Sequence, residues 1–274
     1  MPELPEVETI CRGLESTVLK QKIMDVHVRN FKLRHPIPRN ISQILKGQYF
    51  QKISRRGKYI LLQTKTGTLI IHLGMSGNLQ IKNKDHIAAK HEHLNITFDN
   101  NLVLCYNDPR RFGAILWTTK DPIKHRLLKN LGLEPFAKNF AADFLFNSAK
   151  SKKCSIKQFI MDNSVVTGIG NIYANEILFA TKINPLKKTN TLSLAHYQKL
   201  VKETKRILVL AIKHGGTTIK DHTNSSGKKG MFQNRLKVYG RFGKPCYNCQ
   251  AKLATIKITG RTTVFCPNCQ KICL

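Results

Sequence analysis

Residues 58–81, KYILLQTKTGTLIIHLGMSGNLQI, contain the pattern that decides the fold of the first half of the chain. Two short apolar runs, YILL and TLIIHL, flank a TKTG turn, and this order is typical of two antiparallel strands. A second pair of runs, HLNITF and LVLCYN, flanks an asparagine-rich turn within residues 93–107. Several short strands with tight turns, from Lys22 to about Thr119, therefore predict an antiparallel sandwich or barrel.

Helical patterns lie on both sides of this strand-rich region. Residues 5–19 repeat apolar side chains near helical spacing, and Pro5 suits a first helical turn. After Asp121 helical patterns dominate, most clearly in residues 193–216. Residues 217–235 are polar and rich in Gly, Ser and Lys, which is typical of a long functional loop.

The charge of the chain favours a polyanionic partner. Lys and Arg number 46 against 16 Asp and Glu, which gives a formal net charge of +30. Solubility alone needs a net charge of only about 2–8 on a small domain. The sequence contains no basic amphipathic helix with an aromatic face, so an anionic membrane surface is disfavoured and nucleic acid is favoured.

Targeting signals are not found in the sequence. No stretch approaches the roughly 18 apolar residues of a membrane span, and the N-terminus lacks a basic region followed by an apolar run. We therefore expect a soluble cytoplasmic protein with no membrane partner.

Four of the eight cysteines predict a metal centre. Cys246, Cys249, Cys266 and Cys269 follow the spacing C-x2-C-x16-C-x2-C, which is specific for a tetrahedral zinc site. Two disulfides are the alternative, and an intracellular setting disfavours them. Four thiolates leave no open position for catalysis, so we expect one structural zinc ion.

The N-terminal residues 2–8, PELPEVE, place Glu3, Glu6 and Glu8 beside Pro2 in a chain that has few acids. Removal of the initiator methionine would expose the secondary amine of Pro2. An α-amino group has a pKa of about 7.7–8.0, so much of it is neutral and able to attack a carbon and form an iminium. Carboxylates at the start of a helix are also common, so these residues alone leave both interpretations open.

Residues 168–176, GIGNIYANE, place glycines before a helix start. Exposed N–H groups at such a position can hold a phosphate, with help from Lys157 and Asn171.

Seven motifs occur in one order along the chain: PELPEVET, RRGKY, HLGMSG, NDPRRFG, GIGNIYANE, KVYGR and a final GR…FCPNCQ. Jointly they are highly specific, and the whole chain resembles the bacterial formamidopyrimidine-DNA glycosylase family of base-excision repair. The related endonuclease VIII branch usually starts PEGPE, so PELPE favours the formamidopyrimidine branch.

The resemblance implies an α+β multidomain fold. An N-terminal antiparallel β-sandwich with a terminal helix is expected in residues 1–134 and a linker in 135–150. A helical helix-two-turn-helix domain with a lesion-covering loop is expected in 151–243, and a zinc-finger β-hairpin in 244–274. The implied partner is double-stranded DNA with an oxidised purine, such as 8-oxoguanine, flipped out of the stack. We expect a monomer.

The resemblance also assigns catalytic roles. Pro2 matches the nucleophile that attacks C1′ of the damaged nucleotide, Glu3 the general acid, and Glu6 a supporting carboxylate. Lys58 matches the residue that donates a proton in β-elimination and contacts phosphate. Arg261 matches the zinc-hairpin residue of δ-elimination.

Further positions match DNA contacts of the family: His91, Lys152, Lys157 and Asn171. Met75, Arg110 and Phe112 match the side chains that fill the gap left by the flipped base. Without the resemblance, Met75 and Phe112 would be expected in the core. The chain departs from the family in the loop, where Met231 replaces a common aromatic residue and Lys229 a common proline.

Two other classes of protein stay open. A non-catalytic zinc-ribbon protein that binds DNA or RNA fits the composition and the cysteine spacing, but it has no use for a free amine at Pro2. An endonuclease VIII-like glycosylase for oxidised pyrimidines shares the plan of the chain. Excision of 8-oxoguanine compared with thymine glycol separates the two glycosylases.

Overall fold

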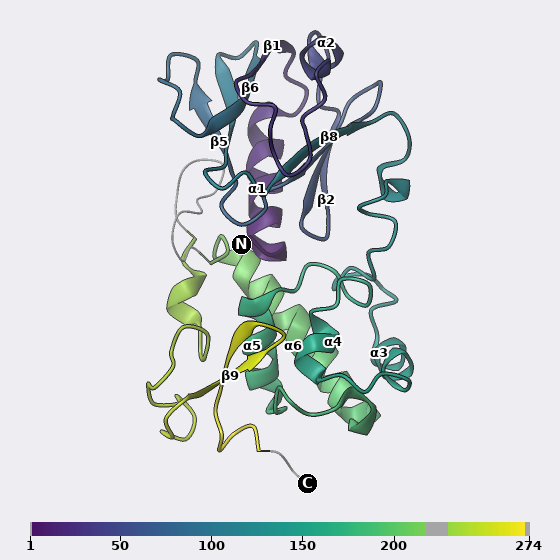
Figure 1. Cartoon of the computed structure of the whole chain (residues 1–274), viewed down its shortest axis with the longest axis vertical. Coiled ribbons are helices and arrows are strands. Elements are labelled where there is room, and N and C mark those ends of the chain that lie inside the picture. Colours follow the sequence, from purple (N-terminus) through teal and green to yellow (C-terminus); the bar gives the residue numbers. More distant parts are fainter. Residues whose placement is uncertain (1, 218–229, 272–274) are drawn as a thin grey trace. The chain divides into compact units, whose positions relative to one another are not determined.

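The computed structural model describes residues 2–217 and 230–271 (Figure 1). The chain forms two compact units. Unit 1 contains Met1–Lys129 and Ile212–Gln233, and unit 2 contains Asn130–Ala211 and Asn234–Leu274.

Unit 1 contains two four-stranded antiparallel sheets. One has the order β2 (Lys52–Arg56), β3 (Tyr59–Gln63), β4 (Thr68–His72), β8 (Ala114–Thr118). The other has the order β1 (Ile23–Val28), β6 (Glu92–Phe98), β7 (Leu102–Asn107), β5 (Asn78–Asn83). The two hairpins expected from the sequence are β3–β4 and β6–β7, and their pairing confirms the antiparallel sandwich.

The core of unit 1 forms between these sheets and the first helix. Helix α1 (Leu4–Val18) contacts β2 and β3, and Figure 1 shows it beside β2. Its buried residues Ile10 and Leu14 belong to one apolar cluster with residues from both sheets, among them Leu62 and Ile96. Two short helices complete the unit: α2 (Ile41–Leu45) and η1 (Pro122–Lys124).

Unit 2 is helical and ends in a β-hairpin. Its helices are α3 (Ala142–Ala149), α4 (Ile156–Ile160), α5 (Asn171–Thr181), η2 (Thr189–Thr191) and α6 (Leu194–Lys213). The last two residues of α6 belong to unit 1, and the short helix η3 (Phe232–Arg235) is divided between the two units. Ser155 caps α4 by accepting a hydrogen bond from the backbone N–H of Gln158, and Lys182 ends α5 in a left-handed conformation. Together with the sandwich, these helices confirm the expected α+β architecture.

The hairpin consists of β9 (Ala254–Ile258) and β10 (Arg261–Phe265), and β10 contacts α5. Phe179 of α5, Leu253 and Val264 bury a small apolar cluster with Cys246 and Cys266. None of the helices in the described residues is both long and apolar enough to cross a membrane.

Candidate functional site

The N-terminal carboxylates are buried at the start of α1. Pro2, Glu3 and Glu6 are all buried, although carboxylates usually lie at the surface. Glu6 Oε2 accepts the backbone N–H of Glu3 at 2.8 Å, and Glu6 Oε1 accepts that of Thr217 at 2.7 Å. One carboxylate therefore fixes both the N-terminal residues and the chain at residue 217.

The backbone around residue 216 fits closely against Glu6. Gly216 has a φ of +77°, and a Cβ there would lie 2.8 Å from Glu6 Oε1. Only glycine combines this conformation with this close approach. Met231 donates its N–H to the carbonyl of His214, and Thr217 bridges to Met231, so the chain before 218 and after 229 is held together. Met231 is 56% exposed, and the expectation for Lys229 lies outside the described residues.

Glu8, the third acid of the N-terminal motif, forms an ion pair with Arg55. Its carboxylate accepts a hydrogen bond from Arg55 Nε at 3.1 Å, while Arg55 Nη1 donates to the carbonyl of Gly57 at 2.9 Å. These contacts hold the turn between β2 and β3, which carries the buried Lys58. Glu8 is therefore a support for the lysine turn.

His72, which sequence reasoning did not single out, lies near Lys58 and binds the backbone beside Met75. Burial, together with the nearby positive charges of Lys58 and Arg34, lowers the pKa of His72 to about 4. The ring is therefore neutral near pH 7, and its Nδ1 accepts the N–H of Gly74 at 3.1 Å. The sequence feature that could have indicated His72 is its place at the start of the HLGMSG motif.

Two neighbouring loops carry Met75, Arg110 and Phe112. The side chains of Met75 and Phe112 are 47% and 45% exposed, in contrast to the core positions that hydrophobicity alone suggests. The Arg110 guanidinium lies over the Phe112 ring at 4.7 Å. Gly74 brings the loops together, since a Cβ at this position would lie 2.5 Å from the backbone of Phe112.

Asp108 connects these two loops through hydrogen bonds to its carboxylate. Its buried carboxylate accepts hydrogen bonds from Ser76 Oγ at 2.6 Å and from the N–H of Gly113 at 2.9 Å. Its N–H donates to the carbonyl of His91, a half-buried residue, at 2.9 Å. His91 and the Arg110 loop are thus held in one framework.

In unit 2, Lys157 and Asn171 contact the zinc hairpin. Lys157 is only 1% exposed, and its Nζ donates to Asn171 Oδ1 at 2.6 Å and to Thr263 Oγ1 at 2.7 Å. Asn171 Nδ2 donates to the carbonyl of Thr262 at 3.0 Å. Both residues therefore fix β10, where Arg261 is exposed at the first position.

Neighbouring residues extend this contact. Asn175 Oδ1 accepts the N–H of Val264 at 2.8 Å, and the buried Glu176 accepts three backbone N–H groups from residues 237–239. Lys152 lies apart from the hairpin network and pairs with Asp162 at 3.2 Å. The DNA contacts assigned to Lys152, Lys157 and Asn171 stay predictions.

The four motif cysteines fit one zinc ion. Their sulfur atoms lie within 4.8 Å of one another, with pairs at 3.4, 3.5 and 3.9 Å. A tetrahedral ion with Zn–S bonds of about 2.3 Å requires sulfur atoms about 3.8 Å apart. Each cysteine in the described residues is free of disulfides.

Comparison with known proteins agrees with this geometry. A model of the formamidopyrimidine-DNA glycosylase N-terminal domain matches residues 1–115, and a model of its H2TH domain matches 131–223. A model of a zinc finger found in FPG and IleRS matches 243–272. Formamidopyrimidine-DNA glycosylase from Pseudomonas entomophila is 48% identical over 99% of this chain and 100% of the relative.

The chain belongs to the formamidopyrimidine-DNA glycosylase family. The same enzyme from Photobacterium profundum is also 48% identical, with the same coverage. In agreement with the zinc-finger match, the four cysteines hold one structural zinc ion, as the spacing predicted.

Solved structures of family members resemble the whole chain. Lactococcus lactis Fpg bound to N7-benzyl-Fapy-dG DNA has a TM-score of 0.91 at 36% identity, covering 98% of this chain and 100% of the other. The wild-type Lactococcus lactis protein bound to DNA with an oxidised pyrimidine has a TM-score of 0.91 at 35% identity, with the same coverage.

Proposed function

We propose that this chain is a bifunctional DNA glycosylase and AP lyase of base-excision repair. It excises oxidised purines from double-stranded DNA and then cuts the strand by β,δ-elimination. The observation that carries the proposal is the pair of buried carboxylates, Glu3 and Glu6, beside Pro2 at the start of α1. Family membership and the solved relatives bound to damaged DNA support it.

The proposed chemistry begins at Pro2 once Met1 is removed. The Pro2 nitrogen attacks C1′ of the damaged nucleotide, the bond from C1′ to the base breaks, and the base leaves with a proton. The Pro2 nitrogen then loses its own proton, the bond from C1′ to O4′ breaks with transfer of a proton to O4′, and the opened sugar is joined to Pro2 as an iminium. Glu3 transfers protons at the sugar, while Glu6 holds the backbone of Glu3 in place. The resulting iminium is positive, so two carboxylates nearby stabilise it.

Strand cleavage then uses the basic residues. Lys58 donates a proton in β-elimination and contacts phosphate, and Arg261 contributes to δ-elimination. Both roles come from the family. Lys58 lies in the turn between β2 and β3, and Arg261 begins β10 directly after the turn that follows β9. The paired strands on either side of each turn support these positions, which favours a fixed catalytic geometry.

Borohydride trapping on an 8-oxoguanine duplex tests the nucleophile. Reduction of the iminium should yield a stable protein–DNA link at Pro2, mapped by mass spectrometry. Pro2→Gly keeps an amine of different geometry and should trap much less, while a retained N-terminal tag should abolish trapping. Full activity with a blocked N-terminus would exclude this mechanism.

A second candidate is excision of oxidised pyrimidines. A relative 35% identical to this chain was solved with oxidised-pyrimidine DNA, so pyrimidine lesions are a reasonable second substrate. Single-turnover excision of 8-oxoguanine and thymine glycol from matched duplexes ranks the two. Faster excision of thymine glycol would reverse the proposed preference.

We further propose that the chain acts as a monomer in the bacterial cytoplasm, associated with the nucleoid. The supporting observations are its full-length similarity to enzymes of Pseudomonas and Photobacterium and its positive charge. Sedimentation of the purified protein tests the monomer, and fluorescence imaging of a C-terminally tagged chain tests the location.

A further inference from the structure

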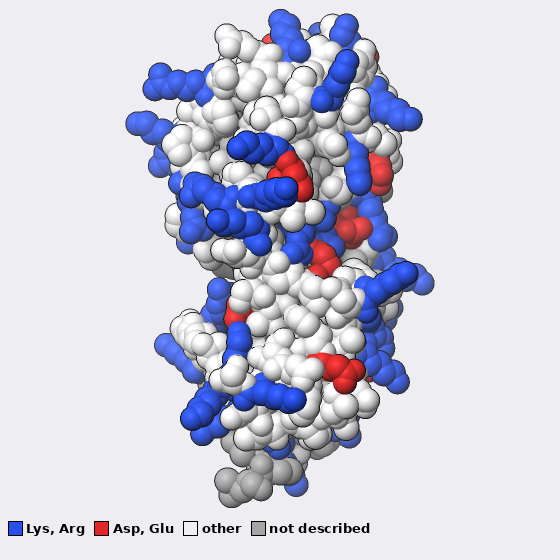
Figure 2. Space-filling model, turned by 90° about the vertical axis from the view of Figure 1, so that its right-hand side faces the viewer, with Lys and Arg blue, Asp and Glu red and all other residues white. Residues whose placement is uncertain are grey.

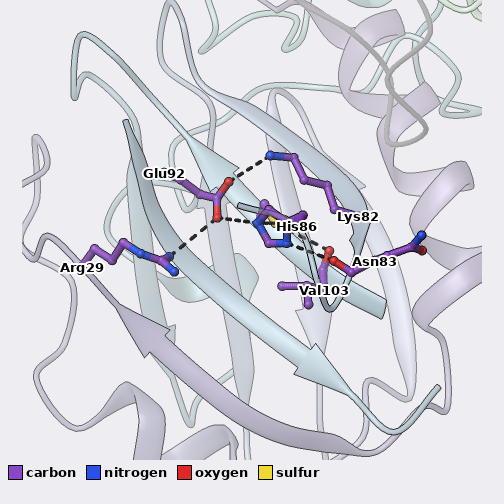
Figure 3. A network of polar contacts seen from close by, with 7 residues as sticks. Arg29, Lys82, Asn83, His86, Glu92 and Val103 are labelled. Atoms are coloured by element: carbon purple, nitrogen blue, oxygen red, sulfur yellow. Dashed lines mark hydrogen bonds and ion pairs between the residues drawn. The ribbon is translucent and has the colours of Figure 1, made fainter. Parts of the chain in front are cut away.

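A second group of metal-binding atoms lies in unit 1, within the sheet formed by β1, β6, β7 and β5 (Figure 3). Glu92 begins β6, Cys105 lies on β7, and His86 follows β5. His86 Nε2 is 2.8 Å from Glu92 Oε1 and 3.4 Å from Cys105 Sγ. Three ligand atoms of different chemistry therefore converge at one point.

We propose that His86, Glu92 and Cys105 form a second metal site, which binds a zinc-class divalent ion. Nitrogen, oxygen and sulfur ligands together suit zinc or cobalt better than magnesium or calcium. Three protein ligands leave a fourth position for water. The site is separate from the four-cysteine centre, which lies in the other unit.

The orientation of His86 favours a ligand role. Its Nδ1 lies 3.0 Å from the carbonyl oxygen of Asn83, and a carbonyl only accepts hydrogen bonds, so Nδ1 carries a hydrogen. Nε2 therefore faces Glu92 and Cys105; without metal its hydrogen is donated to Glu92, and a bound ion would take the place of that hydrogen. Metal-binding histidines are commonly oriented by such a bond from the other ring nitrogen to a carbonyl. A hydrogen on Nε2 serves only Glu92, whereas a metal ion would bind Nε2, the Glu92 carboxylate and Cys105 Sγ together.

The carboxylate of Glu92 is held in place and charged. Its Oε2 accepts a hydrogen bond from Lys82 at 3.0 Å, which leaves Oε1 directed toward His86, as Figure 3 shows. Burial opposes ionisation, but the hydrogen bonds from His86 and Lys82 overcome it and lower the pKa of Glu92 to about 2. Glu92 is therefore an anionic ligand near neutral pH.

Cys105 would bind the metal through its sulfur, after the thiol has lost its proton. Burial, followed by the nearby Glu92 carboxylate, raises the pKa of the Cys105 thiol to about 12. Formation of the metal–sulfur bond releases this proton to water, and no electron is transferred. Lys82 and Arg29, 3.0 and 3.6 Å from the Glu92 oxygens, weaken cation binding. We therefore expect the site to fill after the four-cysteine centre.

Metal binding would tie together three parts of the sheet. His86 belongs to the turn between β5 and β6, which ends beside His91, while Glu92 and Cys105 lie on neighbouring strands. An ion at this site therefore joins the turn to two paired strands.

Cobalt titration of the full chain tests the site. Protein with zinc in its four-cysteine centre is titrated with Co²⁺ near neutral pH, and absorption and metal content are measured. We expect one further equivalent of metal, with a cobalt–thiolate charge-transfer band. Cys105→Ser should lose the band, and His86→Ala should bind cobalt at least about tenfold more weakly.

Cys11→Ser is the matched control, because Cys11 is the other buried thiol of the same unit and is not part of the cluster. It should keep both the band and the second equivalent. Circular dichroism establishes that each variant is folded, and His86→Ala provides the test should Cys105→Ser fail to fold. Absence of a second equivalent, a band that survives in Cys105→Ser, or zinc release equal to the cobalt bound would overturn the proposal.

Discussion

Asp108 illustrates how one buried carboxylate can position several exposed side chains. It holds Ser76 and the N–H of Gly113, while the hydroxyl of Tyr106 donates to it at 3.1 Å. The Ser76 hydroxyl in turn accepts the N–H of Arg110 at 3.2 Å. Arg110 therefore leaves its loop at a fixed point, which a residue that recognises a base requires.

Arg110 is expected to recognise the base opposite the lesion. Its guanidinium carries only donors, and cytosine offers two acceptors, N3 and O2, whereas adenine offers one acceptor beside an amino donor. A bidentate contact discriminates by about 1–3 kcal/mol, so excision of 8-oxoguanine should be roughly tenfold to a hundredfold faster opposite cytosine. Single-turnover excision on the two duplexes measures this ratio.

Two variants distinguish recognition of the opposite base by Arg110 from filling of the gap in the base stack by Phe112. Arg110→Ala should lose the cytosine preference together with activity. Phe112→Ala should lose activity but keep more of the preference, because a phenyl ring has no hydrogen-bonding group. Equal rates opposite cytosine and adenine in the unmutated chain would contradict the assignment.

His72 should make stability depend on pH in the acid range. Its folded pKa of about 4 lies below the ordinary value of 6.5, so between these values the unfolded chain binds the additional proton. Stability should therefore fall as pH decreases from about 6.5 to about 4, by up to about 3 kcal/mol. Urea unfolding of the unmutated chain and His72→Gln at several pH values measures this. An identical pH dependence in both proteins would argue against His72 as the cause.

At the scale of elements, α5 organises the zinc hairpin. Asn171 and Asn175 lie one helical turn apart and bind the backbone of β10 at Thr262 and Val264. These bonds fix β10, and with it the exposed position of Arg261. α5 therefore acts as a positioning element for a residue on another part of the chain.

Asn175→Ala should disturb δ-elimination more than β-elimination. The change leaves the Val264 N–H without its side-chain partner, which costs about 1–3 kcal/mol and loosens the position of Arg261. Product analysis on an abasic duplex should show a smaller share of β,δ-product, as in Arg261→Ala. Asn147→Ala, at an exposed position of α3, is the control and should keep the normal ratio. A normal ratio in Asn175→Ala would refute the positioning role.

The elements themselves were largely predictable from the sequence. Apolar runs separated by turns indicated β3 and β4, and the cysteine spacing indicated the zinc centre, because both patterns are local. The bond from Glu6 to Thr217 and the burial of Lys157 were not predictable, since each depends on residues far apart in sequence. The exposure of Met75 contradicts its hydrophobicity, so only the family resemblance indicated it.

At the scale of the whole molecule, charge is the dominant property. Figure 2 shows Lys and Arg side chains spread over the face that is drawn, with few carboxylates among them. Several of the carboxylates that do occur, including Glu3, Glu6, Glu92 and Glu176, are buried and have structural or proposed catalytic partners. The exposed surface therefore attracts DNA phosphates with little opposition.

DNA affinity should consequently depend steeply on salt. If the chain neutralises about 6–10 phosphates, affinity should fall by about 10³–10⁵ between 50 and 200 mM salt. Fluorescence anisotropy with damaged and undamaged duplexes should give similar slopes of log affinity against log salt, because phosphate contacts carry no sequence information. A salt-independent affinity would rule out phosphate contacts as the main source of binding.

The contact between Gly216 and Glu6 also limits how the gene can evolve. A side chain at residue 216 would meet the carboxylate, and its backbone conformation would disfavour any other residue. A codon change at either position alone therefore disrupts the junction between the N-terminus and residue 217. Among descendants of this chain, the glycine codon should therefore stay unchanged even where the glutamate codon has been replaced, because a smaller side chain at residue 6 would relieve the clash but not the backbone conformation of residue 216.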